Sequence, residues 1–247
     1  MNIFGRTDTG RVRPNNQDAF VCGQLSDTVR FAVVCDGMGG ANGGNVASAL
    51  AVRVISGRLV EGFRPGMEDS SLLNLLEATM AAANIEIYDA AQNDAALQGM
   101  GTTAVVAVAD DAHAVITHAG DSRAYLYTGG VLQQLTRDDS IVQEMVDKGQ
   151  LTEEEARSHP RKNFITKALG VTDDIQAGYL IQPLRKGDGL LLCTDGLTNM
   201  LGAQDIQEIL TDNQPDYVPD KLIAAANRNG GGDNITVVYL TNNGQEA

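Results

Sequence analysis

The sequence predicts a mixed α and β fold with mostly antiparallel sheet and helices that occur in pairs. Three observations support this prediction. The middle of the chain contains short β-prone runs separated by turn residues, two long segments before it have helical apolar spacing, and no linker, repeat or low-complexity tract interrupts the 247 residues. Because this length and a hydrophobic content of 43% suit one large core, we expect residues 1–247 to form a single domain.

The first third of the chain reads as three strands followed by two helices. Residues 29–35 are almost continuously apolar, which is typical of a strand buried on both faces. Residues 45–59 and 70–91 carry apolar residues at helical spacing, with Leu72 and Leu76 on one stripe of the second segment. We expect these two helices to pack against each other.

The remaining elements follow a polar excursion. The pairs Asp110-Asp111, Gly120-Asp121 and Gly129-Gly130 are turns of a predicted antiparallel meander. A helix is expected at 140–148, and the polar segment 149–170, which contains Pro160, is interpreted as a surface flap. Strands are predicted at 102–109, 114–118, 123–127, 131–135, 178–181, 189–193 and 235–241, and helices at 203–210 and 218–227.

Composition excludes several kinds of partner. The chain has 18 lysines and arginines against 32 acidic residues, a net charge of −14, so no basic stripe can neutralise a nucleic acid. No apolar stretch reaches the roughly 18–20 residues of a membrane span. The first residues do not resemble a secretory signal, and the three cysteines show no CxxC spacing. We therefore expect a cytoplasmic monomer without nucleic-acid or membrane partners.

Three aspartates stand at the ends of apolar runs, and each is joined to glycine or asparagine. Asp36 follows residues 31–35, Asp195 follows residues 189–194, and Asp233 precedes residues 235–239. A carboxylate at a strand end is held rigidly, and an adjacent glycine lets a ligand approach. Hard divalent cations prefer such oxygen ligands. This pattern predicts a metal-dependent enzyme, although Asp-Gly and Asp-Asn taken singly are also ordinary turn pairs.

The glycine-rich segment after Asp36 does not match a nucleotide-binding loop. Counted from Gly37, the position of the third glycine in G-x-G-x-x-G is Asn42, and no Walker lysine follows. What remains is an aspartate followed by flexible backbone, whose carbonyl can also bind a metal.

Six segments in order make the chain similar to a known family. They are Arg13-Pro-Asn-Asn-Gln-Asp18, Asp36-Gly-Met-Gly-Gly40, Gly99-Met-Gly-Thr-Thr-Ala104, Gly120-Asp-Ser-Arg123, Asp195-Gly196 and Gly231-Gly-Asp-Asn234. From residue 7 to about residue 240 the chain resembles bacterial members of the protein phosphatase 2C family, which are metal-dependent Ser/Thr phosphatases. The resemblance implies a sandwich of two antiparallel sheets flanked by helix pairs (α-β-β-α), with metals at one end.

The resemblance also implies a set of metal ligands. Asp36 would bridge two Mn²⁺ or Mg²⁺ ions, and Asp18 would act directly or through water. A third, weaker ion is implied near Asp121. The implied ligands are Asp18, Asp36, Gly37, Asp121, Asp195 and Asp233.

Other residues are expected to handle the substrate. The planar guanidinium of Arg13 suits a bidentate grip on a phosphoryl group, so Arg13 is assigned to catalysis together with Asp36. His159, Arg161 and Lys162 in the predicted flap are expected to contact phosphorylated peptides.

The function implied is hydrolysis of phosphoserine and phosphothreonine on proteins by a metal-activated water, without a phospho-enzyme, in opposition to a bacterial kinase. Two alternatives are a catalytically silent module that binds phosphoproteins and a hydrolase of a small phosphorylated metabolite. Two positions depart from the family pattern. Met38 replaces a histidine that is a candidate general acid, which leaves the acid unassigned, and Asp139 replaces another histidine near the rim.

Overall fold

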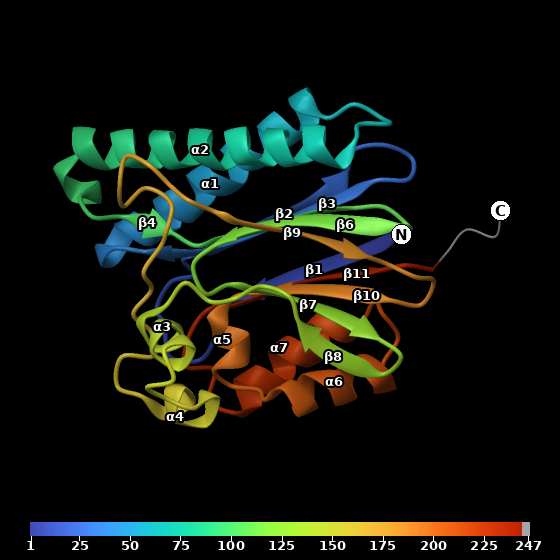
Figure 1. Cartoon of the computed structure of the whole chain (residues 1–247). Coiled ribbons are helices and arrows are strands. Elements are labelled where there is room, and N and C mark those ends of the chain that lie inside the picture. Colours follow the sequence, from blue (N-terminus) through green and yellow to red (C-terminus); the bar gives the residue numbers. More distant parts are fainter. Residues whose placement is uncertain (244–247) are drawn as a thin grey trace.

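The computed structural model describes residues 1–243, and for residues 40–42 its backbone alone. Two antiparallel sheets face each other, with the long helices α1 and α2 outside one sheet and α6 and α7 outside the other (Figure 1). The predicted α-β-β-α sandwich is confirmed. None of the helices in residues 1–243 combines the length and apolar character that a membrane crossing requires.

The first sheet has the strand order β2-β3-β5-β6-β9. Its neighbouring strands are antiparallel, and short turns join only β2 to β3 and β5 to β6, because α1 and α2 separate β3 from β5 and a long segment separates β6 from β9. The bounds are β2 (Asp18–Gln24), β3 (Arg30–Met38), β5 (Ala104–Ala109), β6 (His113–Ala119) and β9 (Gly178–Pro183), and β4 (Gly101–Thr102) pairs with the end of β3.

The second sheet has the order β1-β11-β10-β7-β8, so the first and last strands of the chain are neighbours. The strands are β1 (Asn2–Asp8), β7 (Arg123–Thr128), β8 (Val131–Gln134), β10 (Gly189–Cys193) and β11 (Ile235–Thr241). The helices are α1 (Gly40–Gly62), α2 (Asp69–Asn93), η1 (Ala95–Leu97), α3 (Ile141–Asp147), α4 (Glu153–Ser158), α5 (Asp195–Thr198), α6 (Ala203–Asp212) and α7 (Val218–Arg228).

The layers enclose three apolar cores, and strand alternation assigns each side chain to one of them. On β3, Val33 and Cys35 pack towards α1 and α2, whereas Val34 faces the space between the sheets. On β10, Leu192 faces the same central space and Cys193 packs towards α6 and α7. Strand alternation therefore places Cys35 and Asp36 on opposite faces of β3.

The elements differ from the prediction in several places. The predicted four-stranded meander is wrong, because Gly120-Asp121 is not a hairpin turn but the place where the chain passes from β6 in one sheet to β7 in the other, which leaves two separate hairpins, β5–β6 and β7–β8. Helix α1 begins at Gly40 rather than residue 45, and the short helices α4 and α5 were not predicted. The early start of α1 depends on close backbone packing, because a Cβ atom at Gly44 would lie 2.6 Å from the carbonyl oxygen of Gly37. Apolar periodicity cannot reveal a helical turn built from glycines for such an approach.

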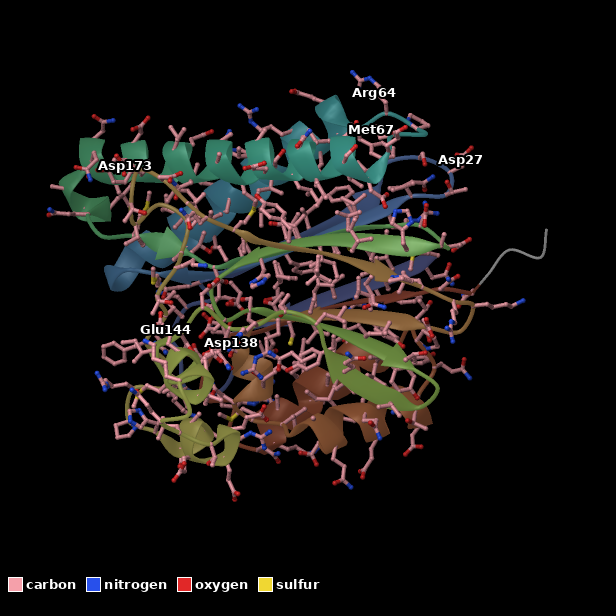
Figure 2. The ribbon with its side chains drawn as sticks, viewed as in Figure 1. Asp27, Arg64, Met67, Asp138, Glu144 and Asp173 are labelled. Carbon is pink, nitrogen blue, oxygen red and sulfur yellow. The ribbon has the colours of Figure 1, made fainter. Side chains whose placement is uncertain are left out.

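One end of the sandwich gathers the predicted ligands. The end of β3, the start of β2 and the end of β10 meet there, and Asp18 lies opposite Asp36 in the register of β2 and β3. Asp138 lies at this end with α3, whereas Asp27, in the turn between β2 and β3, lies at the other end (Figure 2).

Candidate metal centre

Asp36 and Asp18 form the floor of the candidate site. The backbone of Asp36 is fixed by Thr103, whose hydroxyl accepts from the Asp36 N–H at 3.0 Å and whose N–H donates to the Asp36 carbonyl at 2.9 Å. Asp18 is buried, and its Oδ2 accepts hydrogen bonds from the hydroxyls of Thr194 (2.9 Å) and Thr236 (2.7 Å). Both threonines follow the strand alternation that points them between the sheets.

Asp195 is the first residue of α5, directly after β10. The Asn199 side-chain amide donates to Asp195 Oδ2 at 2.9 Å, and the Asn199 backbone N–H donates to the Asp195 carbonyl at 2.7 Å. A Cβ atom at Gly196 would lie 1.8 Å from the carbonyl oxygen of Asn234, so only glycine allows this approach. Gly196 thus brings Asp195 against the segment that carries Asp233.

Asp233 and Arg13 lie together at the more exposed side of the cluster. Arg13 Nη2 donates to Asp233 Oδ2 at 2.8 Å, with the Arg13 side chain 51% exposed. Asn234 holds the loop that carries Arg13, because its side-chain amide donates to the carbonyls of Thr9 and Asn15 and its Oδ1 accepts from the Gln17 N–H. The predicted phosphate-binding arginine is therefore adjacent to a predicted metal ligand.

Asp121 occupies a turn between β6 and β7. The neighbouring Ser122 is buried, and its hydroxyl is 2.7 Å from that of Thr103, the residue that also fixes Asp36. This chain of contacts sets the position of the Asp121 turn relative to Asp36.

The electrostatics show a cluster with unbalanced negative charge. Burial raises the pKa of Asp18 to about 7 and that of Asp121 to about 8, and neighbouring carboxylates, Asp195 first in each case, add to both rises. Burial and then the charges of Asp18 and Asp195 raise the pKa of Asp36 well above its usual range. For Asp195, burial and the charge of Asp233 raise the pKa, and hydrogen bonds with Asp36 and Asn199 oppose the rise.

These residues fit divalent cations. The carboxylates come from distant parts of the chain and repel one another, and a bound cation would relieve this repulsion. Carboxylate oxygens are also the ligands that hard divalent cations prefer. Asp18 Oδ1 is buried and has no hydrogen-bond partner among residues 1–243, which leaves a carboxylate oxygen for an ion or its water. Within the same residues, no group of three or more acidic, histidine or cysteine side chains is arranged so that it could hold a metal ion as it stands. The fit therefore rests on the cluster's charge and on the unpartnered oxygen.

Gly37 lies where β3 passes closest to other backbone. A Cβ atom there would be 2.0 Å from the carbonyl oxygen of Gly44 and 2.6 Å from that of Gln17. This crowding explains the glycine by packing alone. Its role as a metal ligand stays a prediction.

A cavity of about 670 Å³ opens beside the cluster, between the α3–α4 segment and helices α5 and α6. Asp121 and Asp195 line it, and so do the cations Arg157 and Lys162. Lys162 Nζ donates to Asn199 Oδ1 at 3.1 Å, which connects the predicted flap to the residue that holds Asp195.

Of the three flap residues predicted from sequence, Lys162 lines this cavity, and the other two lie elsewhere on the flap. His159 ends α4, and its Nδ1 accepts from the Arg161 backbone N–H at 3.1 Å, while the Arg161 side chain is exposed. Within the described part of the chain, the residues that line the cavity include neither of them. Their contact with substrate stays a prediction.

Several residues at the site were not predicted. Thr194 and Thr236 could have been found from strand alternation, which points them to the face between the sheets, and Asn199 from its i+4 position relative to Asp195.

Comparisons with known proteins agree with this geometry. The family model described as Protein phosphatase 2C matches residues 10–219. The chain is 39% identical to the serine/threonine phosphatase stp of Listeria monocytogenes over 252 residues, covering 100% of both chains. It superposes on the serine/threonine phosphatase of S. agalactiae with a TM-score of 0.91 and 36% identity, covering 97% of this chain and 98% of that one.

A second solved structure is informative about metals. The catalytic domain of the serine/threonine protein phosphatase PstP, solved in complex with two manganese ions, matches with a TM-score of 0.85 and 35% identity over 96% of each chain. The family model covers most of the sequence, and the relatives are similar along their full length. The chain belongs to the protein phosphatase 2C family.

Proposed function

We propose that this protein hydrolyses phosphoserine and phosphothreonine on proteins, with Mn²⁺ or Mg²⁺ as the cofactor. The observation that carries the proposal is the cluster of five aspartates, in which the raised pKa values of Asp18, Asp36, Asp121 and Asp195 indicate negative charge that divalent cations would balance. Family membership supports it, as do relatives named serine/threonine phosphatases and the two manganese ions bound by PstP.

The proposed ligands of two core ions and a third, weaker one are Asp18, Asp36, the Gly37 carbonyl, Asp121, Asp195 and Asp233. Bound ions supply Lewis acidity, which lowers the pKa of a water and neutralises charge on a phosphoryl group. The chain's own contribution is rigidity. Thr103 fixes the Asp36 backbone, Asn199 fixes one oxygen of Asp195, and two threonine hydroxyls fix one oxygen of Asp18.

Arg13 is proposed to bind the phosphoryl group. Its guanidinium has five donors in a planar fork, of which one nitrogen bonds Asp233 in this structure. Asp233 thereby holds the arginine beside the carboxylates, on a loop that Asn234 anchors. Substrate phosphate would meet Arg13 from the exposed side.

The cavity favours a protein substrate over a small metabolite. Its 670 Å³ extends well beyond the carboxylates and reaches Arg157 and Lys162, which suits the residues that flank a phosphorylated side chain. We propose that these two cations, together with His159 and Arg161 on the exposed flap, contact phosphoproteins made by a bacterial kinase.

The test is p-nitrophenyl phosphate hydrolysis with Mn²⁺, with Mg²⁺ and with EDTA. Wild type should hydrolyse p-nitrophenyl phosphate only with a metal. The rate of Asp195→Ala should be about 100-fold lower than that of wild type, as expected for a lost metal ligand or metal-orienting group. Asp212→Ala, which removes an exposed aspartate at the end of α6, is the matched control and should retain full activity.

The alternatives give different results. Folded protein without turnover on any substrate, but with affinity for phosphopeptides, would indicate a binding module. Turnover of small phosphate esters together with inactivity on phosphoserine and phosphothreonine peptides would indicate a metabolite hydrolase.

A further inference from the structure

Asp139 connects two parts of the molecule that the proposed function treats separately. It follows β8, and it contacts both the turn that carries Asp121 and the last part of the flap. Its N–H donates to the Gly120 carbonyl at 3.0 Å, and its Oδ2 accepts from the Gly120 N–H at 3.1 Å. Its carbonyl accepts from the Thr166 N–H at 2.7 Å, and its Oδ1 is 2.8 Å from Lys167 Nζ.

The contacts with Gly120 are reciprocal and therefore restrictive. The backbone N–H and the side chain of Asp139 together bond both backbone polar groups of Gly120. Gly120 has a φ of +103°, and a Cβ atom there would lie 2.6 Å from Thr103 Cγ2. Because glycine has unusual conformational freedom, such a turn needs external bonds to keep one conformation.

The turn is held on its other side as well. Arg123 forms two bonds with Asp138, from Nε to Oδ1 at 2.8 Å and from Nη2 to Oδ2 at 2.6 Å. Asp139 therefore holds Gly120, directly before Asp121, and Asp138 holds Arg123, two residues after it. Removing the Asp139 bonds would leave Asp121 fixed at one side of the turn only.

Lys167 is the cation that balances Asp139. The Asp139 side chain is 14% exposed and that of Lys167 42%, so the ion pair is partly shielded from water. His118 Nδ1 lies 3.9 Å from Asp139 Oδ2, but burial lowers the pKa of His118, so its ring does not supply the balancing charge at neutral pH.

We infer that Asp139 is a positioning residue for Asp121, and that Lys167 keeps Asp139 in place and so couples the end of the flap to the weakest divalent-cation site. The inference rests on the proposed function for the identity of the ion. The structural part, which is the restraint of the turn by Asp139, does not depend on it.

The test uses three variants in the full chain. Asp139→Ala removes both side-chain contacts, Asp139→Asn keeps an acceptor for Gly120 but removes the charge, and Lys167→Met removes the balancing cation and keeps the aliphatic stem. Asp110→Ala is the matched control. Asp110 also accepts hydrogen bonds from backbone N–H groups of a turn, those of Ala112 and His113, but this turn lies before the start of β6, at the end of the strand opposite Gly120.

The first readout is hydrogen exchange in metal-free protein. Asp139→Ala should speed exchange across residues 120–122 by at least about tenfold and leave the strand interiors unchanged. Lys167→Met should shift exchange in the same direction by less, and Asp139→Asn should lie between Asp139→Ala and wild type. The Asp110 variant should leave this turn unchanged.

The second readout is calorimetric titration with Mn²⁺. The tight binding events should persist in Asp139→Ala, and the weakest should require about 10-fold more Mn²⁺, the scale found when a residue that orients a ligand is removed. Activity on p-nitrophenyl phosphate should show the same displacement along the Mn²⁺ axis, with a maximal rate close to wild type at saturation.

Unchanged exchange at residues 120–122 in folded Asp139→Ala would overturn the inference, and so would an equal weakening of all Mn²⁺ binding. Wild type that binds no Mn²⁺ would reject the proposed function instead, and faster exchange in the variant would then still support the restraint. If Asp139→Ala does not fold, Asp139→Asn and Lys167→Met decide the question, and wild-type behaviour in both rejects the inference.

Discussion

Raising the pH from 5 to 8.5 without divalent cations should destabilise this protein, because the fold must then bury charge. Burial, the larger cause, and the nearby carboxylates raise the pKa of Asp18 from 3.8 to about 7. An acid whose pKa is higher in the folded state than in the unfolded state binds more protons when folded. Stability therefore falls as pH rises from about 4 to 7 and stays low above that range.

The magnitude follows from the same pKa. One pH unit within this window changes the free energy of unfolding by about 1.4 kcal/mol per group. Ionisation of Asp18 alone should therefore lower the free energy of unfolding by on the order of 3 kcal/mol between pH 5 and 8.5. Burial raises the pKa of Asp121 to about 8, so this residue adds a loss in the same direction that continues to slightly higher pH.

Urea unfolding in EDTA at several pH values measures this effect, with wild type compared with Asp18→Asn. Asparagine is nearly isosteric, and its side-chain oxygen still accepts from the hydroxyls of Thr194 and Thr236, so the variant removes the charge and keeps the bonds. The variant should gain stability over wild type, and this gain should be about 3 kcal/mol larger at pH 8.5 than at pH 5.

Saturating Mn²⁺ should abolish most of the pH dependence of wild type, because bound cations balance the carboxylates. A metal-free protein whose stability is flat or rises from pH 5 to 8.5 would refute the reasoning. So would a gain from Asp18→Asn that is equal at both pH values, since that result would locate the effect in packing rather than charge.

Three further predictions concern packing, hydrogen bonding and substrate. Gly196→Ala should lower the free energy of unfolding by about 3 kcal/mol or more, because its Cβ would lie 1.8 Å from a backbone oxygen. Gly57→Ala, at an open site inside α1, should raise it by about 0.5–1 kcal/mol. Thermal unfolding compares the two variants. Thr236→Val should lower stability by about 1–2 kcal/mol in urea unfolding at pH 8.5 and by less at pH 5, because Asp18 Oδ2 loses a donor when ionised. Lys162→Ala should raise the KM for an acidic phosphopeptide about fivefold, the equivalent of roughly 1 kcal/mol, with a smaller change for p-nitrophenyl phosphate; equal changes would contradict a substrate contact.

The part of the fold that strand periodicity governs could be predicted from the sequence. The individual strands, the buried run of β3 and the helix pair α1–α2 follow from short-range apolar spacing, which tertiary contacts here reinforce. Apolar spacing does not show which sheet a strand joins, so the predicted meander missed the passage from one sheet to the other between β6 and β7. Helices α4 and α5 could not be predicted in this way. Helix α4 has six residues and a capping box but no buried residue, and α5 has four residues, so neither shows an apolar stripe.

In the candidate site, too, the sequence predicted what local features mark and missed what depends on residues far away in the chain. Asp36, Asp195 and Asp233 were identifiable because each adjoins a strand and a glycine or asparagine, which are local features. Whether Asp18 acts directly or through water depends on which of its oxygens the protein already uses, and that depends on Thr194 and Thr236, far away in sequence. The roles of these residues, like the extent of the single domain, stay predictions.

The donors that hold the aspartates explain how their carboxylates can repel one another and still be ordered. Asp18, Asp195 and Asp233 are each held through a named oxygen by a neutral or cationic donor, from Thr194 and Thr236, from Asn199 and from Arg13 respectively. These donors fix the carboxylates in place but do not cancel their charge, as the raised pKa values of Asp18 and Asp195 show. A fully neutralised cluster would be more stable without metal and would bind cations less tightly. The stability given up in the metal-free state is therefore the same free energy that metal binding recovers, so the pH dependence of unfolding and the metal affinity should change together in every variant of these residues.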